Sequence, residues 1–138
     1  MYDTPQEITY SYGAQAFGGG TITKTIQGPK GKRGRVTYVE ATPTVSFVGT
    51  ATPGAVQVGV TGALTKFANM AMGAAAAGTA AGTPVVASDY ASGLTGSNPQ
   101  SLPFQYAAAD TPVVITLLAP TGGAPAGTAD VVIKIEWF

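Results

Sequence analysis

The last stretch of the chain, residues 131–138, reads VVIKIEWF and decides the fold class. From residue 133 to residue 137 its apolar residues alternate with charged residues. The apolar set is Ile133, Ile135 and Trp137, and the charged residues between them are Lys134 and Glu136. Because successive side chains of a β-strand point to opposite faces, this pattern predicts a strand with the apolar set in a core and the charged set in water.

The same alternation recurs toward the N-terminus and predicts further strands. They cover residues 21–26 (TITKTI), 35–48 (RVTYVEATPTVSFV), 55–60 (AVQVGV), 84–87, 104–107 and 113–118 (VVITLL). In the second of these, alternation assigns Val36, Tyr38 and Glu40 to one face and Thr37, Val39 and Ala41 to the other. Pro43 predicts that this strand is an edge strand or is bent. About seven or eight short strands separated by turn signals are typical of a β-sandwich or barrel.

Other segments lack this alternation. Residues 64–72 contain helix-forming residues with Leu64, Phe67 and Ala68 on one face, which predicts a short helix ending at Gly73. Residues 73–83 (GAAAAGTAAGT) cannot supply core volume and predict a loop. The loops at 92–99 and 120–127 are rich in turn residues. The glycines of residues 18–20 indicate a bulge or a close backbone contact rather than a phosphate-binding loop, because no lysine follows at the required spacing.

The first fifteen residues have few aliphatic side chains, which predicts an extended N-terminal arm over residues 1–15 ahead of a single β-sandwich domain over residues 16–138. The arm carries tyrosines, a residue type enriched at the energetic centres of interfaces. These candidate partner-contact residues are Tyr2, Tyr10 and Tyr12. The alternative is a tail that contacts nothing.

The composition argues against several function classes. The chain of 138 residues has seven basic and seven acidic residues, so no net charge would hold it on nucleic acid or on an anionic membrane. It has no histidine and no cysteine, which excludes Ser-His-Asp triads, thiolate metal sites and disulfides. We therefore expect no enzyme activity and no cofactor or metal. The start of the chain lacks the pattern of a signal peptide, so we expect a soluble protein made in the cytoplasm.

The strongest local signal is a basic stretch, residues 28–35, which reads GPKGKRGR. It holds four of the seven basic residues and no acidic residue: Lys30, Lys32, Arg33 and Arg35. Such a loop can pair with an acidic patch on a partner, and its arginines can bind carboxylates or phosphates with two hydrogen bonds. It can also be a solvated turn. We favour a protein partner or a solubility role over nucleic acid, because no aromatic residue is interleaved to stack on bases.

Four stretches resemble small proteins encoded near the capsid genes of tailed bacteriophages. They are residues 28–35 (GPKGKRGR), 45–47 (VSF), 52–59 (TPGAVQVG) and 127–138 (GTADVVIKIEWF). On these residues the chain resembles the capsid decoration, or cement, proteins. The Ala/Gly-rich residues 73–83 match nothing in that family.

The resemblance implies a jelly-roll-like β-sandwich, often trimeric, on the outside of the phage head, with the major capsid protein as partner. The residues alone do not distinguish a jelly roll from an immunoglobulin-like sandwich. Other functions stay open. The chain can be a head-fibre base or tail structural protein, or a carbohydrate-binding sandwich in which Trp137 and the tyrosines stack on sugars. For Trp137, a place in the core is the favoured alternative.

Overall fold

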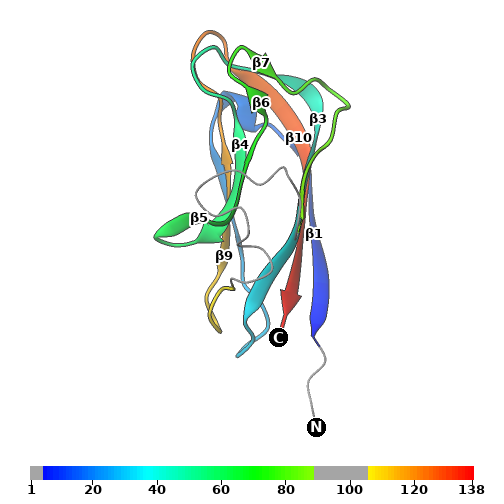
Figure 1. The fold of residues 1–138 in the computed structure, drawn as a ribbon, viewed down its shortest axis with the longest axis vertical. Helices are drawn as coiled ribbons and strands as arrows, with labels where there is room; N and C mark the ends of the chain where they lie inside the picture. Colours follow the sequence, from blue (N-terminus) through cyan, green and yellow to red (C-terminus); the bar gives the residue numbers. More distant parts are fainter. Residues whose placement is uncertain (1–4, 89–105) are drawn as a thin grey trace.

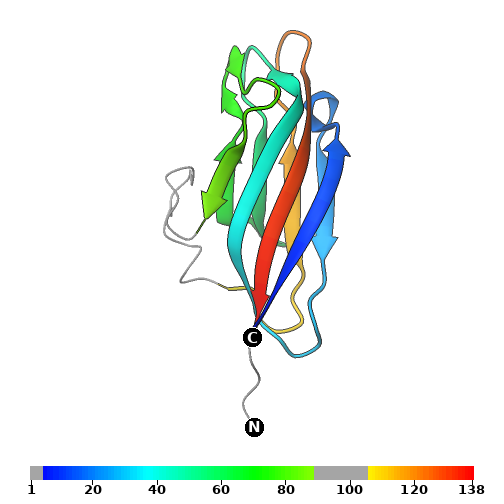
Figure 2. The ribbon, with the colours of Figure 1, turned by 90° about the vertical axis from the view of Figure 1, so that its right-hand side faces the viewer.

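Two four-stranded antiparallel β-sheets lie face to face and form a sandwich, as Figures 1 and 2 show from two directions. The computed structural model describes residues 5–88 and 106–138. The two sheets confirm the all-β class that the alternating sequence pattern predicts. Among the described residues, no helix has the length and apolar character needed to cross a membrane.

The strands divide between the sheets as follows. Sheet A has the order β1 (Gln6–Gln15), β10 (Ala126–Trp137), β3 (Gly34–Val48) and β8 (Val85–Ser88). Sheet B has the order β2 (Ile22–Ile26), β9 (Val113–Leu118), β4 (Ala55–Val60) and β5 (Ala63–Ala71). A small hairpin of β6 (Gly73–Ala74) and β7 (Ala77–Gly78) and a 3-10 turn η1 (Phe17–Gly19) complete the described elements.

The strand pairing identifies the sandwich as a jelly roll. β1 pairs with β10, β2 with β9, β3 with β8, and β4 with β5, so the chain is one long antiparallel hairpin. This hairpin is rolled up, because β10 also pairs with β3 and β4 also pairs with β9. Nested pairs that alternate between two sheets make the double Greek key of a jelly roll. The topology decides between the two sandwich types that the sequence left open.

The core lies between the sheets and includes the predicted core-facing residues of the last strand. Ile133, Ile135 and Trp137 of β10 are buried, and Lys134 and Glu136 on the opposite face are only partly covered. Other fully buried side chains come from η1 and sheet B: Phe17, Phe67, Met70, Ile115 and Leu117. Burying each large aliphatic or aromatic side chain contributes about 1.5–3 kcal/mol. Burial of these apolar side chains therefore stabilises the packing of the two sheets against each other.

The helix predicted over residues 64–72 is wrong, because this segment forms β5. Phe67 and Ala68 are adjacent in sequence and both buried, and a register shift between Val58 and Val60 accompanies them. A short apolar run with an irregularity has no clean period, and pairing with β4 outweighs its local helix propensity. The following residues, predicted to be a loop, include the short β6–β7 hairpin.

The two faces predicted for residues 36–41 are also wrong. Val36, Val39 and Ala41 are all fully buried, although strict alternation separates the first from the other two. Lys134 pairs with Tyr38 and Ile135 with Val36, so one extra residue of β3 is accommodated there. Such a bulge shifts the alternation by one position. The prediction for Pro43 agrees with the structure, since β8 pairs with β3 only at residues 38–41 and ends before this proline.

The N-terminal segment is extended, and most of it belongs to the sandwich. Residues 6–12 pair in continuous register with residues 131–137 of β10, so β1 is an edge strand of sheet A. The alternating residues Ile8, Tyr10 and Tyr12 pack against the core, which gives the segment its place. Residues 1–4 lie outside the described residues, as do the predicted turn at 92–99 and the first two residues of the strand predicted at 104–107. Of the latter strand, Ala107 bridges to Gly34.

Candidate functional site

The basic loop is at the end of the sandwich where the chain terminates at Phe138, the lower end in Figure 1. Residues 27–33 join β2 to β3 there and carry three of the predicted contact residues. We call this surface the basic end. It consists of Lys30, Lys32 and Arg33 together with Tyr106, Asp110 and Phe138, which the following contacts bring beside the loop.

A tight turn fixes the tip of the loop. The N–H of Lys32 donates to the carbonyl of Pro29 at 3.1 Å, and Gly31 has a φ of +76°. A positive φ at the third residue alone defines a type II turn, which favours glycine at this position. The N–H of Gly31 donates to Oδ1 of Asp110 at 2.7 Å and ties the turn to the segment before β9. The tip is therefore held in one conformation and presents the exposed Lys30 at its second position.

Arg33 lies against two aromatic rings at the base of the loop. Its guanidinium carbon lies 4.5 Å from the ring centroid of Phe138 and 4.9 Å from that of Tyr106. These two rings meet edge to face with centroids 5.8 Å apart. At exposed sites each cation–π contact stabilises by about 0.5–1 kcal/mol. The backbones of Arg33 and Phe138 also exchange two hydrogen bonds, of 2.8 and 3.0 Å. The stack thus orders the guanidinium, whose remaining N–H groups can still meet an acceptor.

The loop rests on the buried indole of Trp137. A Cβ added at Gly28 would lie 2.3 Å from Cζ3 of this ring, and one at Gly34 would lie 2.5 Å from it. Only glycine allows so close an approach, so the two glycines that flank the basic residues set the position of the loop. The indole Nε1 donates to the hydroxyl of Tyr10 at 3.0 Å. Trp137 is only 2% exposed, which confirms its place in the core and leaves no face for a sugar.

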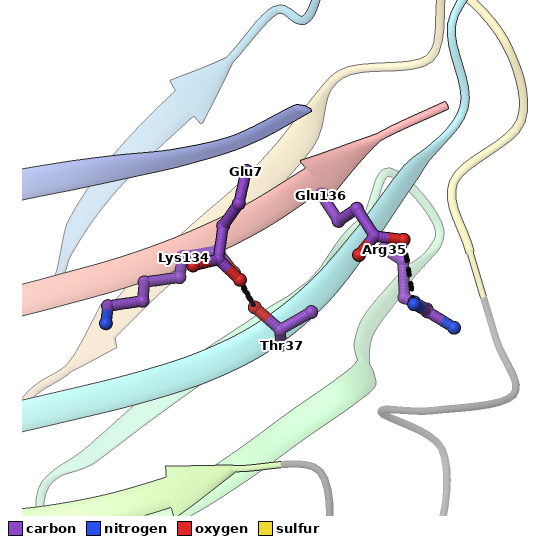
Figure 3. Close-up of polar contacts among 5 residues, drawn as sticks. All are labelled: Glu7, Arg35, Thr37, Lys134 and Glu136. Carbon is purple, nitrogen blue, oxygen red and sulfur yellow. Dashed lines mark hydrogen bonds and ion pairs between the residues drawn. The ribbon is translucent and has the colours of Figure 1, made fainter. Parts of the chain in front are cut away.

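Arg35 is separated from the basic end, because it lies on the outer face of sheet A (Figure 3). It forms a 2.7 Å ion pair with Glu136 on the neighbouring strand. Glu136 in turn stands directly opposite Glu7 of β1, whose carboxylate accepts a hydrogen bond from the hydroxyl of Thr37 at 3.0 Å. Two like charges, Glu7 and Glu136, are therefore neighbours on adjacent strands, and Thr37 and Arg35 of β3 each bind one of them. The ion pair is partly exposed and contributes under about 1 kcal/mol.

The next row of the same face is built around Tyr38. Lys134 reaches back over its ring, with Nζ 5.1 Å from the centroid. The Tyr38 hydroxyl donates to the carboxylate of Glu40 at 2.6 Å. This hydrogen bond, followed by burial and the negative charge of Glu40, raises the pKa of Tyr38 above its ordinary value. The outer face of sheet A is therefore a mixed-charge surface whose groups largely pair with one another.

The tyrosines of the predicted arm lie in the seam between β1 and β2. Tyr10 and Tyr12 are half-buried on the core side of β1, and Nζ of Lys24 from β2 lies 5.7 Å from the Tyr12 ring centroid. Burial, and to a lesser extent the neighbouring Tyr10, raises the pKa of Tyr12. Both side chains therefore support the edge of the sandwich. Tyr2 lies outside the described residues.

Charge is unevenly distributed over the molecule. Residues 41–65, 67–88 and 111–129 contain no charged side chain. They supply the loops and the β6–β7 hairpin at the upper end in Figure 1, opposite the basic end. In the described chain, charges concentrate at the basic end and on the outer face of sheet A. The basic end is thus the exposed cationic surface that a charged partner would meet first.

The structure brings together some of the predicted site residues and separates others. Lys30, Lys32 and Arg33 share one loop, whereas Arg35, Tyr10 and Tyr12 have roles within the sheets. The basic stretch has no aromatic residue within it, yet the fold supplies two rings from distant segments. Local sequence held no signal for them, since β-pairing at the chain end brings them to the loop. Within the described residues, no three acidic side chains cluster as a metal site.

Comparison with known proteins gives a weak structural likeness. No family model matches this chain, and no curated protein matches its sequence. Among solved structures, a chain of the "Cyanophage Pam1 capsid asymmetric unit" is similar, with 24% sequence identity and a TM-score of 0.48. The similarity covers 96% of this chain and 85% of that chain. A likeness of this size does not carry a function from one chain to the other.

Proposed function

We propose that this chain is a virion structural protein of a tailed bacteriophage, and specifically a capsid decoration protein that binds the outer surface of the head. The observation that carries the proposal is the basic end: a cationic loop held rigid on a jelly-roll sandwich. The jelly roll is an architecture that viral capsid domains use, although lectins and cupins share it. Fold alone does not give function, so the argument rests on the surface.

The basic end is suited to an acidic patch on the major capsid protein. Lys30 is exposed at the tip of an ordered turn, and the Arg33 guanidinium is already oriented by its two rings. Order present before binding lowers the entropy lost on binding. Carboxylates opposite these cations would form charge-assisted hydrogen bonds, and the surrounding field would speed the encounter. In this proposal Lys30, Lys32 and Arg33 contact the shell directly.

The remaining predicted contact residues have different roles in the proposal. Tyr10 and Tyr12 act indirectly, since Tyr10 receives the hydrogen bond of Trp137, on which the loop rests. Arg35 acts within sheet A through Glu136. A shell offers many copies of one patch, so modest contacts add up through multivalency if the protein binds as a homo-oligomer. The sequence resemblance implies a trimer, whereas the free edge strand described below favours a dimer, and either assembly would multiply the contacts in this way.

Two alternative functions make different use of the same molecule. A head-fibre base or a tail protein would bind elsewhere on the virion, and purified heads and tails separate these cases. A carbohydrate-binding sandwich loses its main candidate, because the ring of Trp137 is buried. We therefore retain it only as an outcome to be tested on a glycan array.

The test compares charge reversals at two lysines in a head-binding assay. Lys30→Glu at the basic end should weaken co-sedimentation with undecorated heads at least about tenfold, because it replaces an attraction with a repulsion. Lys66→Glu changes the net charge equally but lies on β5, and should leave binding unchanged. Equal binding by the two variants would refute the basic end as the contact surface. Single-stranded DNA as a competitor separates a protein partner from a nucleic acid, since it should not displace the protein from heads.

The contribution of Tyr2 needs a shorter truncation than the whole predicted arm. Removing residues 1–15 would delete β1 and expose the core, so loss of binding would have two causes. Removing residues 1–4 leaves every described strand intact. We expect weaker head binding from this truncated chain. Unchanged binding would remove Tyr2 from the contact surface and leave the basic end as proposed.

A further inference from the structure

The sandwich has four edge strands, and three of them are protected against pairing with another chain. β2 has only five residues, and its Lys24 points to the core side, where it lies over Tyr12. β8 has four residues and follows Pro84. β5 carries Lys66 and is irregular where it pairs with β4. Short length, proline, irregular pairing and an inward-pointing charge are the usual devices that block edge-to-edge association.

β1 follows Pro5 and its pairing is irregular beyond Tyr12, but the seven residues between these two points have none of these devices. It has ten residues, and residues 6–12 pair with β10 without a shift. This regular segment contains no lysine or proline, and its one charged residue, Glu7, is near its start. Figure 2 shows β1 in blue at the margin of sheet A, and no strand of residues 5–88 or 106–138 pairs with its outer side. Its outer row of backbone N–H and C=O groups is therefore a template for a further strand.

We propose that β1 pairs with β1 of a second copy of this chain, antiparallel and centred on Thr9. This register uses the whole regular segment, because residues 6–12 then lie opposite residues 12–6 of the second copy. Seven opposed residues would exchange roughly six to eight backbone hydrogen bonds. The two sheets A would join into one continuous eight-stranded sheet. Such an interface is isologous, as in most protein homodimers.

The side chains fit this register on both faces. On the core side, Ile8 lies opposite Tyr10 of the second copy, so two half-exposed apolar side chains cover each other. Cross-strand pairs of an aromatic with a β-branched residue are among the favourable ones. On the outer face, Glu7 lies opposite Ser11 of the second copy. The two Glu7 side chains are about 14 Å apart along the ladder, beyond the screening length of about 8–10 Å in physiological salt.

The register predicts that two substitutions of Ser11 have opposite effects on dimerisation. Ser11→Lys adds two Lys–Glu pairs per dimer and should tighten dimerisation, whereas Ser11→Glu adds two like-charge pairs and should weaken it. Each change should be roughly two- to thirty-fold in dimer dissociation constant and should shrink at high salt. Thr25 is the matched control, since it is an exposed position on edge strand β2, and Thr25→Lys and Thr25→Glu should have no effect. Sedimentation equilibrium of the full chain measures all five proteins.

A crosslink tests the two-fold axis independently. The chain has no cysteine, so Thr9→Cys introduces a single thiol that meets its own copy on the axis. Opposed residues of an antiparallel pair have Cα atoms about 4.5–5.5 Å apart, within the range for a disulfide. Oxidation should give a covalent dimer of Thr9→Cys and little of Thr25→Cys. Any of three results would overturn the proposal. The parent chain is monomeric or trimeric, the two charge variants of Ser11 dimerise alike, or Thr9→Cys and Thr25→Cys crosslink equally. The proposed function does not enter this test, because no heads are present.

Discussion

Replacing Gly28 by alanine should destabilise the protein although it adds a single methyl group. The new Cβ would lie 2.3–2.5 Å from three carbons of the Trp137 ring, closer than any van der Waals contact allows. The ring cannot move freely, because it is buried and its Nε1 is hydrogen-bonded to the Tyr10 hydroxyl. Overpacking of this kind costs about 1–3 kcal/mol, which corresponds to a fall in melting temperature of roughly 4–12 °C in a domain of this size.

Gly20 provides the matched control for this substitution. Its φ of 175° is extended backbone, and a Cβ there meets no atom within 4 Å. Gly20→Ala should be neutral or stabilise by up to about 1 kcal/mol, because alanine restricts the unfolded chain. Urea unfolding followed by the fluorescence of the single tryptophan gives both free energies of unfolding. If Gly28→Ala and Gly20→Ala have equal stability within about 0.5 kcal/mol, the claim that the indole sets the loop position is refuted.

Two further predictions concern the core and the outer face of sheet A. Ile133→Ala should lower the free energy of unfolding by about 2–5 kcal/mol, because Ile133 is buried in the core. Val86→Ala, at an exposed position, should change it by under about 0.5 kcal/mol. If urea unfolding gives equal losses for the two variants, the assignment of buried and exposed faces is wrong. The pKa of Tyr38 is raised in the folded protein, so the stability that it contributes is fully present below pH 10 and is lost as pH rises through the folded-state pKa. Between neutral and strongly alkaline pH, Tyr38→Phe should therefore lose less stability than the parent protein.

The alternating pattern could predict where the strands are, because burial of one face leaves a local signal. Residues 113–118 and 131–137 are strands as predicted, and Ile133, Ile135 and Trp137 are the predicted core-facing side chains. The pattern fails where pairing between distant strands outweighs it. The bulge near Thr37 depends on the pairing of β3 with β10, and β5 is a strand because β4 lies beside it. Local propensity cannot report such non-local contacts.

The candidate site could be predicted only in part for the same reason. The cluster of basic residues is visible in the sequence, and Gly31 is compatible with the positive φ that the turn needs at its third position. The aromatic partners of Arg33 come from the chain end and from the segment before β9, and only the jelly-roll topology brings them together. The sequence shows Gly28 only as a typical turn residue. That the Trp137 ring packs against it, and so requires glycine, is known only from the structure.

The most direct test of the proposed function is to count the copies of this protein that bind to undecorated heads of its source phage. We predict saturable binding at micromolar protein, with a copy number that is a multiple of the symmetry sites of the shell, and loss of binding when Lys30 is changed to glutamate. No binding to heads at these concentrations would contradict the decoration function, and binding to purified tails instead would assign the protein to another part of the virion.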